Sequence, residues 1–129
     1  MQEGQGEEVW VDGARFVGSY KKGMKHGYGI YTWPDKSVFQ GDWQENEITG
    51  YGKYQWNDGR VYEGYWLRND MHGKGMYRWP DGRTYKGSFV KDKKHGYGVY
   101  TFPDKRCYKG EFKDGLQHGK GVFMTPDGK

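Results

Sequence analysis

The feature that most constrains the fold of this chain is a repeat with a constant period of 23 residues. Residues 85–107 read YKGSFVKDKKHGYGVYTFPDKRC and align column for column with the 23 residues before them. Such a period is typical of solenoids, in which one supersecondary unit cannot bury its apolar face without a neighbour. We therefore predict an array of five repeats, which cover residues 16–38, 39–61, 62–84, 85–107 and 108–129.

Within each repeat we number the positions from 1, which is Phe16 in the first repeat, to 23. Residues 1–15 match the second half of a repeat in part, because Trp10 falls in the column of Trp33. Arrays of this kind need terminal units that cover the open face of the first full repeat. We expect residues 1–15 to form a partial repeat that caps the array.

Each repeat contains two segments in which apolar or glycine residues alternate with polar ones. In the fourth repeat Tyr85, Gly87 and Phe89 alternate along the first segment, and residues 96–102 form the second. A period of two is typical of β-strands, and the short connections require antiparallel hairpins. The sequence thus predicts an all-β fold, an elongated single-layer solenoid of antiparallel β-hairpins with five full repeats and a partial N-terminal repeat.

The composition would suit a disordered chain if its aromatic residues were ignored. Only 33% of the 129 residues are hydrophobic and the mean hydropathy is −1.17, but 19% are aromatic and 23 are glycine. Most rings fall at positions 1, 5, 16 and 18, and most glycines fall at positions 3, 12 and 14. A strand glycine leaves bare backbone that an aromatic ring can cover. We expect each hairpin to cover the glycines of its neighbours with its rings.

Two positions of the repeat predict left-handed turn residues. Position 8 carries only Gly, Asn or Asp, the residue types that tolerate positive φ. Position 21 follows an aspartate and carries glycine in most repeats, but Lys36 and Lys105 stand there in two of them. If φ is positive at these lysines, each should cost about 1 kcal/mol relative to glycine.

These motifs resemble the MORN (membrane occupation and recognition nexus) repeat. The pattern Tyr-x-Gly-x-Trp/Phe, His-Gly-x-Gly-x-Tyr and Asp-Gly recurs in the five units, with departures such as Thr49 in the histidine column. The resemblance implies an elongated hairpin solenoid, usually intracellular, that serves as a protein-binding or self-associating scaffold in cytoskeletal, ciliary and membrane-junction proteins. It also implies phosphoinositide binding, proposed for some members, or a role as an accessory region of a larger enzyme.

Rows of aromatic side chains are the best candidates for a binding site, because such residues dominate protein interfaces. We expect most rings at positions 1 and 16 to be buried by packing, and the rings at position 5 to stay partly exposed. The exposed rings would line a groove that binds a peptide or helix of a protein partner. The candidate groove residues are Trp43, Trp66 and Phe89 at position 5, and Tyr54, Tyr77 and Tyr100 at position 16. The opposite face is a second candidate surface, with Tyr28, Tyr51, Tyr97, Ile30, Met76 and Val99.

Peripheral binding to anionic phospholipid is the alternative function. Residues 1–84 carry 11 basic and 12 acidic side chains, whereas residues 85–129 carry 10 and 5, so the net charge of +4 belongs to the last two repeats. A basic surface attracts an anionic membrane, although lysines also keep strand edges soluble. The candidate lipid contacts are Lys91, Lys93, Lys94, Lys105 and Arg106. Nucleic acid is not an expected partner, because the charge excess is small and the rings are committed to packing.

No residue pattern indicates catalysis. The four histidines share position 11, which places them about 10 Å apart on successive repeats, too far apart to share a metal ion. The aspartates at position 20 fall in turns, where an aspartate bonds local backbone. We therefore expect no active site, no metal and no cofactor.

The cysteine count and the hydropathy of the chain bear on its cellular setting. The chain has one cysteine, Cys107, and no apolar stretch of about 20 residues that could span a bilayer. We expect a soluble, intracellular and cytoplasmic protein, and the family resemblance implies an association with the cytoskeleton or the cilium. A homo-oligomer formed through the ends of the array is a further alternative.

Overall fold

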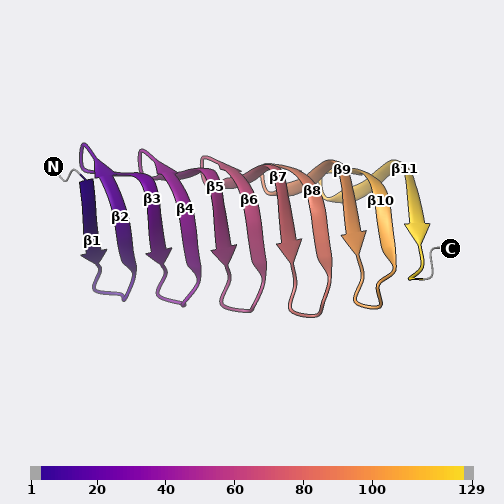
Figure 1. The fold of residues 1–129 in the computed structure, drawn as a ribbon, viewed down its shortest axis with the longest axis horizontal. Helices are drawn as coiled ribbons and strands as arrows, with labels where there is room; N and C mark the ends of the chain where they lie inside the picture. Colours follow the sequence, from indigo (N-terminus) through magenta and orange to yellow (C-terminus); the bar gives the residue numbers. More distant parts are fainter. Residues whose placement is uncertain (1–3, 127–129) are drawn as a thin grey trace.

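The computed structural model describes residues 4–126, in which every regular element is a β-strand. All the strands form one antiparallel sheet whose spatial order is the order of the sequence. Figure 1 shows them side by side along a single elongated layer, so the predicted all-β hairpin solenoid is confirmed. The strands are β1 (Gly4–Val9), β2 (Arg15–Lys21), β3 (Met24–Thr32), β4 (Val38–Gln44), β5 (Glu47–Gln55), β6 (Val61–Leu67), β7 (Asp70–Arg78), β8 (Thr84–Val90), β9 (Lys93–Thr101), β10 (Cys107–Lys113) and β11 (Leu116–Met124).

Each hairpin closes through a two-residue turn in which both residues are left-handed. In the third repeat Arg68 and Asn69 have φ of 47° and 71°. The residues at positions 7 and 8 of the other repeats also have positive φ. Two positive φ values are typical of the type I′ turn, whose twist matches that of the flanking strands. The left-handed position 8 is confirmed. The second strand begins at position 9, earlier than the alternation of residues 96–102 indicated, because the turn is this short.

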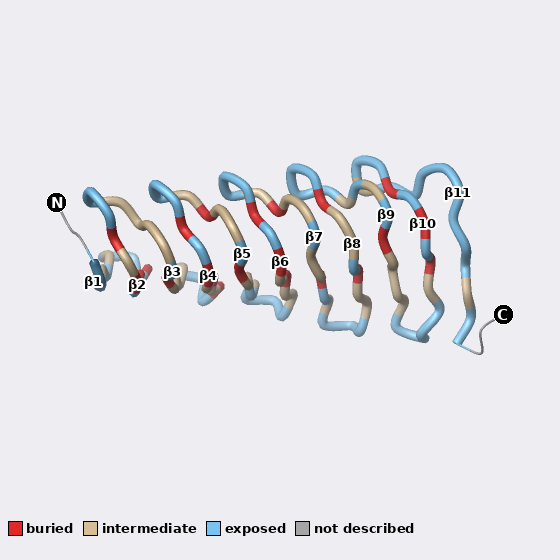
Figure 2. The backbone as a smooth tube through the Cα atoms, turned by 45° about the horizontal axis from the view of Figure 1, so that its top comes forward, coloured by how far each residue is buried: buried red, intermediate tan, exposed pale blue. Residues whose placement is uncertain are grey.

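A bulge bends every full hairpin near its tip. On β6 and β7, Gly64 pairs with Gly75 and Trp66 pairs with Met71, so three residues of β7 face the single residue Tyr65. Gly73 lies in the bulge with φ of 94°. Such an insertion bends the strand that carries it. Figure 2 shows the resulting curvature, since each hairpin arches instead of lying flat.

The rings at position 1 form the most buried layer of the sheet. Phe16, Phe39, Tyr62 and Tyr85 are fully buried. Each ring lies on glycines of its own hairpin: a Cβ at Gly75 would overlap the ring of Tyr62. The prediction that rings cover glycines is confirmed, but the prediction that a neighbouring hairpin supplies them is wrong. Positions 1, 3 and 14 share one face and one hairpin, so the nearest ring is the hairpin's own.

Neighbouring hairpins instead hold together through contacts between rings and between backbones. Tyr62 meets Phe89 of the next repeat edge to face, with ring centroids 5.1 Å apart. Asn69 reaches back to the preceding repeat, where its N–H donates to the Ile48 carbonyl at 2.9 Å and its Oδ1 accepts from the Ile48 N–H at 2.8 Å. We call this reciprocal pair of bonds the latch. Asn46 makes it with Lys25, and Asp92 makes it with Met71.

The turns between repeats and the N-terminal strand follow the sequence pattern. Lys36 and Lys105 have φ of 77° and 76°, so the left-handed position 21 is confirmed. Asp58 accepts from the backbone N–H and the guanidinium of Arg60. Asp35, Asp81 and Asp104 accept the equivalent backbone N–H, so the turn role is confirmed for these four aspartates, and Asp127 lies outside the described residues. Strand β1 pairs with β2 along the N-terminal edge of the first full repeat.

Candidate functional site

The two faces of the sheet carry different side chains. We call the face that carries positions 1, 5, 16 and 18 the ring face, and the face that carries positions 2, 4, 13 and 15 the outer face. The hairpin tips bend toward the ring face, because Ile48 and Met71 at position 10 are buried in the same cluster as the rings.

The expectation that the rings at position 5 stay partly open is wrong. Trp43, Trp66 and Phe89 are only 6%, 6% and 3% exposed. The bent hairpin tips bring position 10 against these rings, and the sequence period does not encode this curvature. The position 5 rings are therefore part of the core, and their truncation would destabilise the array.

The rings at position 16 join those at position 18 in one continuous row. Tyr54 lies 4.5 Å from Trp56, which lies 5.3 Å from Tyr77, and Tyr77 lies 4.4 Å from Trp79, all measured between ring centroids. The row continues to Tyr100 and then to Phe102. Tyr77 is buried, whereas Tyr54 and Tyr100 are partly exposed. The tryptophans at position 18, which the sequence marked as periodic but not as site residues, are partly exposed as well.

Two adjacent hollows on the ring face form what we call the inner groove. Their volumes are 420 and 490 Å³, and they adjoin at Lys94 and Gly115, which line both. Of the predicted groove residues, Tyr77, Phe89 and Tyr100 line the inner groove, whereas Trp43, Trp66 and Tyr54 do not. The other aromatic lining residues are Trp56, Trp79, Phe102 and Phe112.

Cations lie over the rings of the inner groove. The guanidinium carbons of Arg60 and Arg83 are each 4.9 Å from the ring centroids of Trp56 and Trp79. Lys94 Nζ lies 5.7–5.8 Å from three rings, including that of Tyr100. Burial lowers the pKa of Lys94 below its ordinary value. Lys25 occupies the equivalent place in the first repeat, and burial lowers its pKa as well.

The candidate lipid contacts do not form one patch. Lys91 and Lys93 lie at the hairpin tip between β8 and β9, whereas Lys105 and Arg106 lie in the turn at the other end of β9. Arg106 pairs with Asp104 at 2.6 Å. Lys94 points into the rings of the inner groove. The structure therefore separates these five residues, because residues close in sequence lie at opposite ends of a long strand.

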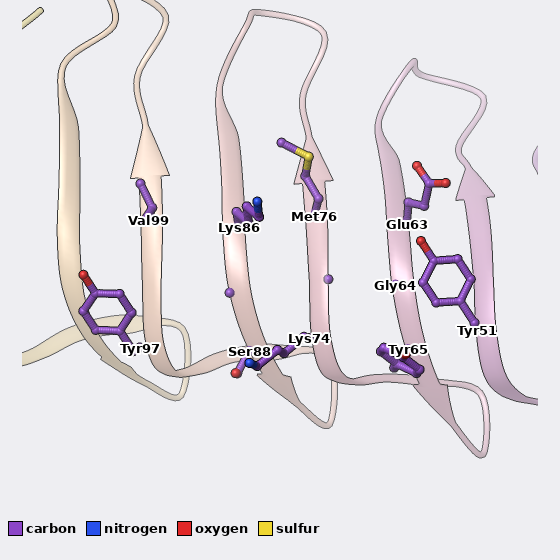
Figure 3. Close-up of a pocket in the computed structure, with 12 residues that line it drawn as sticks. Tyr51, Glu63, Gly64, Tyr65, Lys74, Met76, Lys86, Ser88, Tyr97 and Val99 are labelled. Carbon is purple, nitrogen blue, oxygen red and sulfur yellow. The ribbon is translucent and has the colours of Figure 1, made fainter.

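Three hollows follow one another along the outer face and form what we call the outer trough. Their volumes are 310, 660 and 700 Å³. The first two share Tyr51 and Glu63, and the last two share Tyr97. Figure 3 shows the central hollow, in which glycines separate a row with Glu63 and Met76 from a second row of side chains.

The described residues contain neither a metal-binding cluster nor a membrane-spanning helix. Within residues 4–126, no three His, Cys, Asp or Glu side chains gather closely enough to hold a metal ion. The same part of the chain contains no helix of the length and apolarity required to cross a membrane.

The fold has solved relatives of low sequence identity. The SAS-4 (dCPAP) TCP domain of Drosophila melanogaster, solved in complex with a proline-rich motif of Ana2 (dSTIL), is 16% identical, with a TM-score of 0.54 over 96% of this chain and 74% of that one. The G-box domain of the microcephaly protein CPAP is 19% identical, with a TM-score of 0.56 over 97% of this chain and 72% of that one. Identities this low show similarity of fold alone.

The sequence itself identifies the family. A search of curated proteins gives no significant match. The sequence model of the MORN repeat, however, matches six successive segments that together cover nearly the whole chain: residues 1–15, 16–38, 39–59, 62–82, 85–105 and 108–129. The chain belongs to the MORN repeat family.

Proposed function

We propose that this chain is a protein-binding module that holds a segment of a partner, a peptide or a helix, in the inner groove. The observation that carries the proposal is the continuous row of rings at positions 16 and 18, each tilted against the next. Its members remain partly exposed at Tyr54, Trp56, Trp79 and Tyr100, although Tyr77 in the same row is buried. Rigid aromatic side chains in a concave surface are the usual anchors of protein interfaces.

The groove favours an apolar segment that also carries acidic residues. Its walls include Arg60, whose guanidinium also pairs with Asp58 at 2.8 Å, against the carboxylate of Asp92. They also include Lys93 and Lys94, which form no ion pair within residues 4–126. A carboxylate of the partner would lie beside ammonium and guanidinium groups that the rings already hold in place. The fixed positions of these cations reduce the entropy that binding would cost.

The comparisons support a protein partner without identifying it. The TCP domain with the same fold was solved with a proline-rich motif of another protein, and the structure of the CPAP G-box domain suggests for that protein a role in centriole elongation. By analogy with these proteins we propose an intracellular setting at the cytoskeleton. Lipid binding receives less support, because the basic residues predicted for it lie at opposite ends of β9.

Capture experiments with matched surface variants test this proposal. Trp79→Ala removes a partly exposed ring of the inner groove, and Tyr65→Ala removes an exposed ring of the outer face. Some of the proteins captured from cell extract by the immobilised chain should be lost with Trp79→Ala and kept with Tyr65→Ala. Circular dichroism must show that both variants remain folded. Equal capture by all three proteins would contradict the inner groove as the binding site.

Liposome co-sedimentation tests the lipid alternative. Vesicles that contain phosphatidylinositol phosphates should bind the chain weakly and without dependence on the two ends of β9. Steep loss of binding with salt, together with loss in the Lys91→Ala/Lys93→Ala variant, would instead favour a membrane function.

A further inference from the structure

We propose that the outer trough is a second docking surface, and that it takes an extended proline-rich segment with acidic residues at every third position. This surface lies on the opposite face from the inner groove. The inference therefore does not depend on the occupant of that groove.

The floor of the outer trough is bare backbone. Gly64 pairs with Gly75, Gly75 with Gly87, and the same row of paired glycines crosses the sheet from β1 to β11. The glycines would project side chains only toward the ring face, where the position 1 rings occupy that space. The flanking residues at positions 2 and 15 and at positions 4 and 13 form the two walls, which Figure 3 shows on either side of the glycines.

The walls carry well-exposed aromatic side chains. Tyr28, Tyr51, Tyr65 and Tyr97 are between 47% and 59% exposed. Tyr51 and Tyr65 form an edge-to-face pair with ring centroids 5.3 Å apart. Within residues 4–126, none of these four hydroxyl groups has a hydrogen-bond partner. Each tyrosine thus offers an apolar ring and a free donor, the combination with which aromatic grooves hold proline-rich chains.

The floor of the trough determines which backbone conformation can bind. The N–H and C=O groups of the glycine row are directed along the sheet to neighbouring strands, so they cannot pair with a chain that lies on the face. A segment in β conformation would leave its own N–H groups without partners. A polyproline II segment makes no internal hydrogen bonds and loses donors wherever proline stands. The outer trough therefore favours a proline-rich segment over a β-strand.

The repeat spacing matches the pitch of this helix. Two strands per repeat give an advance of about 9.6 Å along the sheet. Polyproline II has three residues per turn at about 3.1 Å each, an advance of about 9.3 Å per turn. Every third residue of the bound segment would therefore meet the same wall of successive repeats.

The charge of the walls predicts which residue type occupies every third position of the bound segment. Lys74, Lys86, Lys109 and Lys120 line the central and last hollows, and none of them forms an ion pair among the described residues. The acidic side chains of the first and central hollows already have partners, because Glu63 lies 3.6 Å from Arg78 and Asp42 accepts from the Tyr51 N–H at 3.1 Å. A carboxylate on every third residue would complement these free lysines.

Synthetic peptides test both the conformation and the spacing. Fluorescence anisotropy would compare twelve-residue labelled peptides with four copies of Pro-Pro-Glu, four copies of Pro-Pro-Lys, and a block arrangement of eight prolines and four glutamates. We expect the first peptide to bind at least about tenfold more tightly than the other two, with weaker binding at high salt. Equal binding of the regular and block peptides would overturn the pitch match, and equal binding of the lysine peptide would overturn the proposal.

Variants of the exposed side chains locate the binding surface. Tyr65→Ser and Lys86→Glu each change a residue whose side chain is not part of the core, so the fold should persist. Each should weaken binding of the Pro-Pro-Glu peptide by at least about tenfold. Trp79→Ala, which changes only the inner groove, should leave it unchanged. Loss of binding with Trp79→Ala but not with Tyr65→Ser would place the peptide in the inner groove and overturn the proposal.

Discussion

The indole Nε1 of Trp66 donates a hydrogen bond to the backbone carbonyl of Gly52 at 3.2 Å. Gly52 belongs to the preceding repeat, and Trp43 makes the same bond with Gly29 one repeat earlier. The position 5 ring therefore connects two hairpins through its polar edge while its apolar faces pack against other rings. This bond explains why a tryptophan can be buried here without leaving its N–H unpaired.

Substitutions at position 5 should separate the contribution of the ring from that of the bond. Trp66→Phe keeps a ring but loses the donor, and should lower the free energy of unfolding by about 1 kcal/mol. Trp66→Ala also removes the ring, and should cost about 3–5 kcal/mol. Urea denaturation followed by circular dichroism measures both values. A cost for Trp66→Ala below that for Trp66→Phe would show that the ring is not part of the core.

The contact between Tyr62 and the glycines below it predicts a strong energetic coupling. Gly75→Ala places a methyl group where the ring lies, and should destabilise the array by about 1–3 kcal/mol. In a Tyr62→Ala background the same change should cost much less, because the ring is gone. A double-mutant cycle measures this coupling. Equal costs in the two backgrounds would show that the ring does not cover Gly75.

The latch at position 8 can be divided into its backbone and side-chain parts. Asn69→Gly keeps the positive φ but removes the bond to the Ile48 N–H, and should cost about 1 kcal/mol. Asn69→Ala loses the bond and also strains the turn, so it should cost about 1 kcal/mol more. Amide exchange at Ile48 should become faster in both variants. Unchanged exchange in both would contradict a role for the Asn69 side chain.

Replacing a left-handed lysine should stabilise the array. Lys105 has φ of 76°, so Lys105→Gly should raise the free energy of unfolding by about 0.4–1 kcal/mol despite the more flexible unfolded chain. Lys105→Ala is the matched control, because it removes the same charge without relieving the backbone. Thermal denaturation should place Lys105→Gly above the parent and Lys105→Ala at or below it. The reverse order would mean that the charge, not φ, decides stability.

Buried tyrosines should make the fold sensitive to alkali. Burial raises the pKa of Tyr85 to about 12 and raises the pKa of Tyr62 as well. An unfolded tyrosine ionises near pH 10, so their contribution to stability is complete below that pH and is lost as the pH rises through the folded pKa. Lys25 and Lys94, with lowered pKa values, act in the opposite direction. They are outnumbered, because burial also raises the pKa of Tyr20, Tyr31, Tyr54 and Tyr77.

The test of this pH dependence replaces tyrosine at position 1 with phenylalanine, which the chain already carries at that position in two repeats. Phe16 and Phe39 occupy position 1 in the first two repeats, so Tyr62→Phe/Tyr85→Phe should fold. Urea midpoints measured from pH 8 to pH 12 should fall less steeply in the double variant than in the parent. Parallel curves would show that these two hydroxyl groups do not control alkaline unfolding.

The local structure of the repeat could be predicted from the sequence more fully than its curvature. Positive φ at Asn69 and Lys105 was predictable, because the requirement is local and few residue types meet it. The burial of Trp66 was not, because alternation assigns a residue to a face but does not say whether another segment covers that face. Here the covering residues, such as Met71, reach the rings only through a bulge that the residue pattern does not reveal.

For the candidate surfaces too, the residues that recur with the period were predictable, whereas contacts that depend on the three-dimensional fold were not. The aromatic row was predictable at Tyr77 and Tyr100, which recur with the period, but the cations above the rings were not. Lys94 was grouped with the other basic residues because it is adjacent to them in sequence, whereas the strand direction places it among rings. The outer face was predicted as a second surface through Tyr51 and Tyr97, but the shape of its trough depends on three-dimensional spacing.

The latch gives the molecule a mechanical polarity. Asn46, Asn69 and Asp92 each fasten their own hairpin to the one before it, and within residues 4–126 no latch runs toward the hairpin after it. When a pulling force detaches the last hairpin at the C-terminal end, the latch of that hairpin breaks, and the latch of the hairpin before it stays intact. The array should therefore extend in separate steps of one hairpin each. A partner that binds across two hairpins would raise the force needed for each step.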